Sequence, residues 1–170
     1  MFWFELILVA EPHIANKAGD AAALAQPHVL GGARPHTLLY VEDNPANLMV
    51  VEQIIAEHPH ICMLSARDGS IGIALARTYL PDVILMDINL PGISGIEALN
   101  ILRQDPATKH IPIVAISANA MLRDIERGIA AGFFRYLTKP IKVNEFMEAM
   151  DIALEFADQQ IVRITKDEGQ

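Results

Sequence analysis

The sequence contains little of what several common classes of protein require. Its single cysteine, Cys62, excludes an internal disulfide. Because Cys62 lies in an apolar stretch, we expect it to be a buried small hydrophobe rather than a nucleophile. The chain has 13 Lys and Arg residues against 21 Asp and Glu, and its net charge of -8 disfavours direct binding to nucleic acid through phosphate neutralisation.

Long apolar runs and metal-binding histidine pairs are also missing. The apolar start, Met1–Ala10, carries Glu5, lacks a basic leading region and is too short to span a bilayer, so we predict neither a signal peptide nor a membrane helix. The six histidines show no metal-ligand spacing, and no G-x-G-x-x-G or P-loop motif follows an expected strand, which disfavours a nucleotide-binding module. These features are typical of a cytoplasmic protein.

The apolar content is sufficient for one domain of ordinary size. Hydrophobic residues make up 52% of the 170 residues and charged residues 20%, which permits a sizeable core and disfavours wholesale disorder. We divide the chain into a strand-like segment at 1–10, a linker at 11–36 that is rich in Ala, Gly, Pro and His, a domain at 37–157, and a tail at 158–170 that is too short for an output domain.

Four apolar strands end in chemically useful side chains. The expected strands at 37–41, 83–86, 113–116 and 134–138 are followed respectively by Glu42 with Asp43, by Asp87, by Ser117 and by Lys139. In a parallel sheet these ends lie along one edge, so the side chains can converge although they are far apart in sequence. A strand-end Asp can also simply cap a turn, so Asp87 alone does not decide between the two interpretations.

Helical periodicity occupies the intervals between the strands. We expect helices at 45–57, 69–80, 95–104, 120–130 and 143–157, with Asn44 and Asp68 as N-caps and a further strand at 61–64. The second helix has an apolar stripe of Ile71, Ala74, Leu75 and Thr78, and the fourth has Leu122, Ile125 and Ile129. Five consecutive β/α units predict an α/β fold, a doubly wound five-stranded parallel sheet of order 2-1-3-4-5 with five helices.

The strand-end motifs VEDN, LMDINLPGISG, ISAN and YLTKP, in this order and spacing, resemble the receiver domain of two-component response regulators, which has a flavodoxin-like fold. The resemblance covers about Thr37 to Ala157 and is closest to receivers at the C-terminal end of hybrid sensor histidine kinases. The run FWFEL near the start resembles the last strand of a kinase ATP-binding domain, although Ile7 stands where a proline is expected. The alternative is an unrelated apolar N-terminus that packs on the receiver.

The acidic residues suggest a metal site. Three carboxylates within a few ångströms repel one another unless a cation lies among them, and Mg²⁺ prefers oxygen ligands. The resemblance implies that Asp43 and Asp87 ligate Mg²⁺ directly, that Glu42 acts through water, and that the backbone carbonyl of Asn89 adds a ligand.

The resemblance also implies a chemistry and a switch. Asp87 would be the phosphoacceptor, Lys139 would neutralise the transferring oxygens from a cis Lys139–Pro140 peptide, and Ser117 would donate its hydroxyl to the phosphate. Tyr136 matches the family's rotating aromatic residue; the alternative is a fixed, half-buried tyrosine.

The implied partners are a histidine kinase or a histidine phosphotransfer domain. They and any downstream protein would bind the face formed by the fourth helix, the fifth strand and the last helix, where Phe133 and Phe134 could be a contact surface or core. On this interpretation the chain is a signalling domain rather than an enzyme, and the catalytic domain of a hybrid parent is absent from it.

Two other functions are weighed against this one. A receiver-like docking module that takes no phosphate would be indicated by the loss of a site residue. None of the motif residues is missing here. A hydrolase of the aspartyl-phosphate type would need a second Asp two residues after Asp87, where this chain has Asn89.

Overall fold

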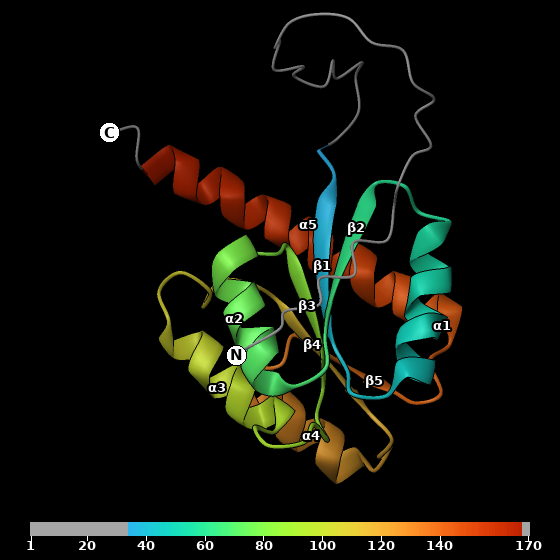
Figure 1. Cartoon of the computed structure of the whole chain (residues 1–170). Coiled ribbons are helices and arrows are strands. Elements are labelled where there is room, and N and C mark those ends of the chain that lie inside the picture. Colours follow the sequence, from blue (N-terminus) through green and yellow to red (C-terminus); the bar gives the residue numbers. More distant parts are fainter. Residues whose placement is uncertain (1–33, 168–170) are drawn as a thin grey trace, which may run out of the picture. The chain divides into compact units, whose positions relative to one another are not determined.

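The computed structural model describes residues 34–167, which form five parallel strands alternating with five helices (Figure 1). The predicted fold is confirmed, and the strand order is β2-β1-β3-β4-β5. The segment at 1–10 and nearly all of the linker lie outside the described residues. The elements are β1 (His36–Val41), α1 (Pro45–Ala56), β2 (Ile61–Ala66), α2 (Gly69–Tyr79), β3 (Val83–Asp87), α3 (Gly95–Gln104), β4 (Ile113–Ser117), α4 (Leu122–Ala131), β5 (Arg135–Thr138) and α5 (Val143–Asp167).

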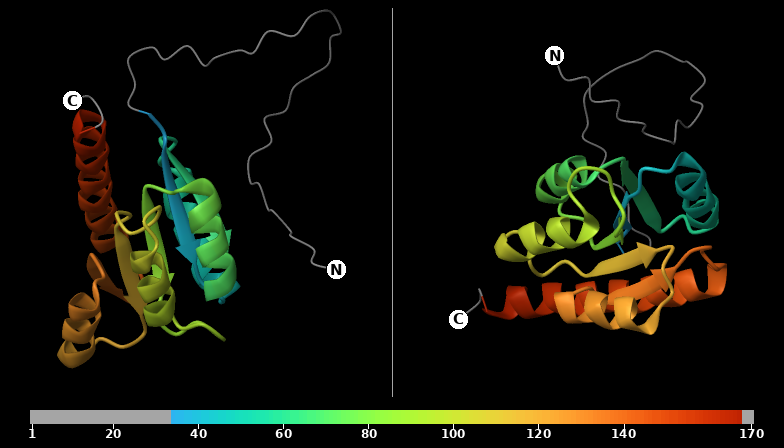
Figure 2. Two further views of the ribbon diagram at one scale, coloured as in Figure 1. Left: turned by 90° about the vertical axis from the view of Figure 1, so that its left-hand side faces the viewer. Right: turned by 90° about the horizontal axis from the view of Figure 1, so that it is seen from below.

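The sheet is covered on both faces, which explains its near-continuous apolar strands. All residues of β3 and β4 are buried. One core cluster packs α1 and α5 against the sheet through residues such as Val51 and Phe146, and a second packs α2 and α3 through residues such as Ala76 and Leu99. Figure 2 shows α5 on the opposite side of the sheet from α2.

Polar caps begin three of the helices where the sequence predicts helix starts. The side chain of Asn44 accepts a hydrogen bond from the backbone of Ala46, and the side chain of Asp68 accepts one from Ile71. Ser94 and Glu97 form a reciprocal capping box at the start of α3, whose two predicted bounds both match the structure.

The buried face of α2 differs from the predicted stripe. The residues that the structure buries are Gly69, Gly72, Ile73 and Ala76, whereas Ile71 is exposed. A Cβ atom at Gly72 would lie 2.7 Å from a methyl group of Val41, so at this contact the helix approaches β1 through glycine, and the buried face is rotated away from Ile71.

The apolar stripe predicted for α4 is also largely outside the core. Leu122 and Ile129 are exposed, and among the residues of α4 only Gly128 is buried. Gly128 faces the ring of Tyr136 on β5. Because this contact sets the rotation of the helix, the apolar residues on its other sides point to solvent.

Two further predictions are wrong. Cys62 is exposed, because it lies on β2, an edge strand in which only the first and last residues are buried. The last helix does not end at Ala157 but continues to Asp167. No glycine or proline occurs between these two residues to end it.

The capping box provides a test of how the loop after β3 is held. We expect Ser94→Ala to lower the free energy of unfolding by about 1 kcal/mol, because the first turn of α3 loses the hydrogen bond that the serine hydroxyl accepts. Urea denaturation measures the change. Ser70→Ala, at an exposed position inside α2, is the control and should change stability by less than about 0.5 kcal/mol. Equal losses in the two variants would contradict a specific capping role for Ser94.

Candidate functional site

The carboxyl edge of the sheet brings together most of the side chains that the sequence singles out. Glu42 follows β1, Asp87 ends β3, Ser117 ends β4 and Lys139 follows β5. The strand register places Asp87 beside Ile116 of β4. Side chains separated by up to 97 positions (42 to 139) therefore meet at one edge because the strands are parallel.

Lys139 links two buried carboxylates. Its Nζ atom lies 2.6 Å from Oδ2 of Asp87 and 2.8 Å from Oε2 of Glu42. Burial lowers the pKa of Lys139, but the hydrogen bonds and charges of the two acids outweigh it and raise the pKa above its ordinary value. The lysine therefore stays charged and is the direct counterion of both acids. The Lys139–Pro140 peptide is cis, as the family resemblance implies.

Glu42 is fully buried and has several hydrogen-bond donors. Besides Lys139, it accepts hydrogen bonds from the hydroxyl of Tyr40 at 2.9 Å, the backbone of Asn44 at 3.1 Å and the side chain of Asn47 at 3.1 Å. Burial raises the pKa of Glu42, but these hydrogen bonds, led by that from Lys139, leave it below the ordinary value. Glu42 is therefore held as a carboxylate.

Asp87 receives less stabilisation than Glu42. It is 2% exposed, and within the described residues 34–167 its one hydrogen bond besides that of Lys139 comes from the backbone of Asn89 at 2.9 Å. Burial raises the pKa of Asp87 above its ordinary value, even though the hydrogen bond from Lys139 lowers it. A Cβ atom at Gly95 would overlap the backbone carbonyl of Asp87, so the start of α3 packs directly against this loop.

The acidic residues can supply a set of oxygen ligands. One carboxylate oxygen from each of Glu42, Asp43 and Asp87 lies within 4.8 Å of the others. Asp43 is exposed and has no hydrogen bond or ion pair with any of residues 34–167, so its carboxylate is available to a ligand. Oxygen donors of this number and charge fit a hard divalent cation such as Mg²⁺. Asn89 lies in the adjoining loop.

The backbone of Asn119 connects Ser117 to Tyr136. Its N–H donates to Oγ of Ser117 at 3.1 Å, and its carbonyl accepts from the hydroxyl of Tyr136 at 3.1 Å. The ring of Tyr136 is half-buried against Gly128 of α4. A movement of Ser117 would therefore be passed to the tyrosine through a single residue.

Sequence reasoning missed three residues that shape this site. Tyr40 donates a hydrogen bond to Glu42, and the strand period of two, continued one residue past β1, was a usable signal that the two side chains lie on the same side. Asn47 reaches Glu42 from the first turn of α1, and Asn119 follows Ser117 by two residues. Asn119 is part of the ISAN motif, but the motif alone assigned it no role, and no sequence pattern marks Asn47, because each acts through loop or helix-start geometry.

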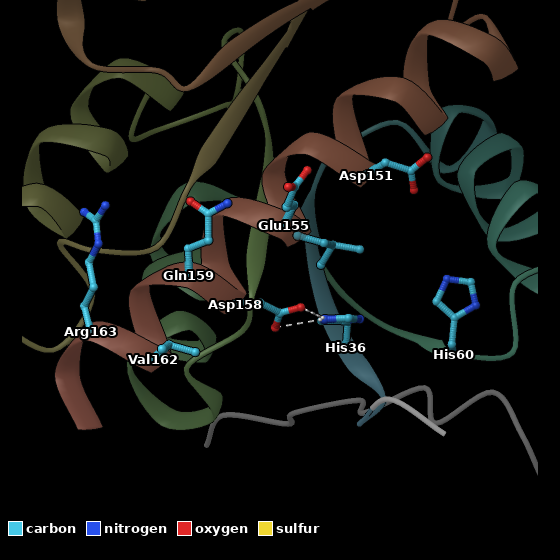
Figure 3. Close-up of a pocket in the computed structure, with 9 residues that line it drawn as sticks. His36, His60, Asp151, Glu155, Asp158, Gln159, Val162 and Arg163 are labelled. Carbon is cyan, nitrogen blue, oxygen red and sulfur yellow. Dashed lines mark hydrogen bonds and ion pairs between the residues drawn. The ribbon is translucent and has the colours of Figure 1, made fainter. Parts of the chain in front are cut away.

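A cavity of about 700 Å³ lies elsewhere, at the amino ends of β1 and β2 (Figure 3). His36, at the start of β1, lies 3.1 and 3.2 Å from the two carboxylate oxygens of Asp158 on α5. Because all five strands are parallel, this cavity is at the sheet edge opposite Asp87. It contributes nothing to the carboxylate cluster.

Comparison with known proteins agrees with this geometry. Residues 38–151 match the family described as the response regulator receiver domain. The chain therefore belongs to the receiver domain family, the phosphoacceptor domains of two-component signalling systems. Among residues 34–167, no helix combines the length and apolar character needed to cross a membrane.

Individual relatives extend the comparison. The chain is 39% identical over 116 residues to the polar-differentiation response regulator DivK of Brucella anthropi, a match that covers 68% of this chain and 94% of that protein. A putative response regulator from Chloroflexus aurantiacus superposes with a TM-score of 0.68 at 30% identity, covering 72% of this chain and 99% of the other. The receiver domain of sensor histidine kinase PA1611 from Pseudomonas aeruginosa PAO1, which has a magnesium ion coordinated in its active site cleft, is 32% identical with a TM-score of 0.63, covering 72% and 98%.

The raised pKa of Asp87 predicts that this carboxylate destabilises the metal-free fold. A group whose pKa is raised by folding contributes stability below its unfolded-state pKa and loses that contribution as the pH rises through the folded-state pKa. We therefore expect Asp87→Asn to raise the free energy of unfolding by about 0.5–2 kcal/mol at pH 7.5, with a smaller gain near pH 4. Urea denaturation in EDTA measures both values. A loss of stability at pH 7.5 would contradict the prediction.

Proposed function

We propose that this receiver domain accepts a phosphoryl group on Asp87 from a phosphohistidine, in a magnesium-dependent step, and thereby switches a protein-binding surface. The observation that carries the proposal is the position of Asp87, a buried carboxylate with a raised pKa, 2.6 Å from Lys139 and within the cluster that also contains Glu42 and Asp43.

The residues available to hold Mg²⁺ are Asp43 and Asp87 directly, Glu42 through water, and Asn89 through its backbone carbonyl. The ion, when bound, supplies positive charge to the oxygens of the transferring phosphoryl group. A magnesium ion is coordinated in the active site cleft of the similar receiver from Pseudomonas aeruginosa, which supports the assignment. The uncommitted carboxylate of Asp43 supports it from this chain's own geometry.

In the proposed reaction an oxygen of Asp87 attacks phosphorus. The new O–P bond forms as the N–P bond of the phosphohistidine breaks, and the imidazole nitrogen leaves with the electron pair. Lys139, already at the carboxylate, would stabilise the negative charge on the transferring oxygens. Ser117, 2% exposed at the end of the neighbouring strand, would donate its hydroxyl to a phosphate oxygen of the product.

The proposed output passes from Ser117 to Tyr136. When Ser117 turns toward the phosphate, the hydrogen bond that the Asn119 N–H donates to its Oγ atom is strained. The carbonyl of Asn119 also accepts the hydrogen bond of the Tyr136 hydroxyl, so the strain reaches the tyrosine. The tyrosine ring would then leave its position against Gly128, which alters the surface of α4 and β5.

The partner surface that we propose is the face of α4, β5 and α5. Met121, Leu122 and Ile129 expose apolar side chains on or next to α4, which favours a protein contact there. A histidine kinase or a histidine phosphotransfer domain would be the phosphodonor, within or downstream of a hybrid histidine kinase in the cytoplasm. Phe133 does not belong to this surface, because it is buried in the core.

The alternatives have less support. A docking module without phosphorylation would not need a lysine held between two buried acids, yet Lys139 has that position. In a hydrolase of the aspartyl-phosphate type, a second acid would activate water, but Asn89 follows Asp87 by two residues and offers no titratable group.

Incubation with acetyl phosphate tests the proposal. We expect the intact mass to rise by one phosphoryl group with Mg²⁺ present and to stay unchanged in EDTA, because the acidic cluster must hold the ion. Asp87→Asn should gain no mass, and Asp82→Asn, which alters an acid outside the site, should gain it as the parent does. Phosphorylation of Asp87→Asn to the parent's extent would show a different acceptor. A folded parent that takes no phosphate from acetyl phosphate or from a phosphohistidine protein would favour the docking module.

The contact between Gly128 and Tyr136 provides a test of the switch. In Gly128→Ala the new Cβ atom would lie 2.8 Å from Cδ2 of the tyrosine ring, so the ring must move from α4 before phosphorylation. We expect the ring resonances of Tyr136 in the unphosphorylated variant to shift toward those of the phosphorylated parent. Ala130→Gly, which changes helix propensity by about 1 kcal/mol on the exposed side of α4, is the control and should leave these resonances in place. Identical Tyr136 spectra in Gly128→Ala and the parent would contradict a mobile ring.

A further inference from the structure

A second cavity, of about 510 Å³, opens at the amino ends of β4 and β5. It is lined by residues of the loops before these strands, by Arg103 of α3, and by Phe156 and Gln160 of α5. These two α5 residues are four positions apart and share one face of the helix, whereas Asp158 and Val162, which line the cavity of Figure 3, share another. The two cavities are therefore on different sides of α5, and both are far from Asp87.

The charge of this cavity is opposite to that of the chain. Among the residues that line it, Arg103, Lys109 and His110 are basic and none is acidic. The chain as a whole carries a net charge of -8. The cavity in Figure 3, by contrast, is lined by the acidic residues Asp151, Glu155 and Asp158. The lining of this cavity is therefore basic, although acidic residues outnumber basic ones in the chain as a whole.

No carboxylate among residues 34–167 is a counterion of Arg103. Its guanidinium donates to the backbone carbonyls of Lys109 at 2.6 Å, Ile111 at 2.8 Å and Gly132 at 3.1 Å, all of which are neutral. Burial lowers the pKa of Arg103, but an arginine remains protonated in proteins. Three of its five N–H donors are used in this way, and no other group among residues 34–167 accepts the remaining two. A positive charge is therefore held in place at the cavity without neutralisation.

Aromatic rings form the apolar wall beside these charges. The rings of Phe134 and Phe156 have their centroids 5.0 Å apart at an interplanar angle of 43°. Phe133, which precedes Phe134 in the loop between α4 and β5, is 3% exposed. The tilted pair of Phe134 and Phe156 forms an apolar wall next to uncompensated positive charge, which matches a ligand that has a planar ring and a negative group.

We propose that this cavity binds a small organic anion in which a phosphate or carboxylate is joined to a planar ring. Arg103, Lys109 and His110 hold the charged group, and Phe134 with Phe156 contacts the ring. The volume is within the range of about 300–1,000 Å³ that is typical of small-molecule sites. The site does not depend on phosphorylation of Asp87, and the proposal stands or falls separately from the phosphoacceptor function.

Titration of the ¹⁵N-labelled 170-residue chain with adenosine 5′-monophosphate in EDTA tests the proposal. We expect a Kd below about 1 mM, with the largest amide shifts at His110, Gly132 and Phe134. Adenosine, which lacks the charge, and inorganic phosphate, which lacks the ring, should each bind at least about tenfold more weakly. An unchanged Kd in Asp87→Asn would show that binding is independent of the phosphoacceptor site.

Variants separate the parts of the cavity. Lys109→Gln and His110→Gln change exposed side chains, so the fold should persist, and we expect each to weaken binding by about threefold to tenfold. Lys142→Gln, an exposed lysine paired with Glu145 on another part of the surface, is the matched control and should not change the Kd. Phe156→Leu keeps the apolar character of the position and should reduce the advantage of the nucleotide over inorganic phosphate.

Several results would overturn the proposal. One is the absence of binding at millimolar nucleotide. Another is a set of amide shifts confined to the loop after Asp87 or to the cavity of Figure 3. A third is equal affinity of the Lys109→Gln variant and the parent for the nucleotide. Equal affinity for inorganic phosphate and the nucleotide would show an ion site without a role for the phenylalanines, and would also overturn it.

Discussion

The ion pairs of Lys139 with Asp87 and Glu42 are the interaction on which the candidate site depends. The two acids come from neighbouring strands, β1 and β3, and both are almost completely buried. Two carboxylates buried this close together would raise each other's pKa, and protonation would be favoured if no cation were near. The lysine reaches them from the end of β5, beyond β4, so the four strands from β1 to β5 in the sheet must be assembled before both charges are compensated.

The surroundings then divide the two acids into different roles. Glu42 has three hydrogen-bond donors besides Lys139, which lowers its pKa most, and together they hold that pKa below its ordinary value. Among residues 34–167, Asp87 has one backbone donor besides Lys139, and burial raises its pKa. A carboxylate with few fixed donors can exchange them for new partners at a small cost, and one that is fully bonded cannot. The asymmetry favours Asp87 as the reacting group and Glu42 as a fixed negative charge.

Sequence patterns predicted the strands and the residues at their ends because both depend on strong local signals, namely buried apolar runs that stop at a polar residue. The strand order followed from the doubly wound arrangement of five β/α units. Sequence patterns predicted the buried faces of the helices less well, because tertiary contacts determine how a helix is rotated against the sheet. The rotation of α2 and α4 follows from Gly72 against Val41 and from Gly128 against Tyr136, and a glycine contributes nothing to an apolar stripe. The hydrogen bonds of Asn47 and Asn119 depend on the geometry of a helix start and of a loop, which a residue pattern does not encode.

The two ends of β5 connect the site to the cavity at the other edge of the sheet. Arg135–Thr138 is a strand of four residues, with Phe134 immediately before it and Lys139 immediately after it. At about 3.3 Å per residue, the five steps from Phe134 to Lys139 span roughly 16 Å. Tyr136 lies in its middle and is held by one hydrogen bond to Asn119 and by contact with Gly128. Phe134 therefore begins the same strand that Lys139 anchors to the acids, so β5 is the direct covalent connection between the two edges of the sheet.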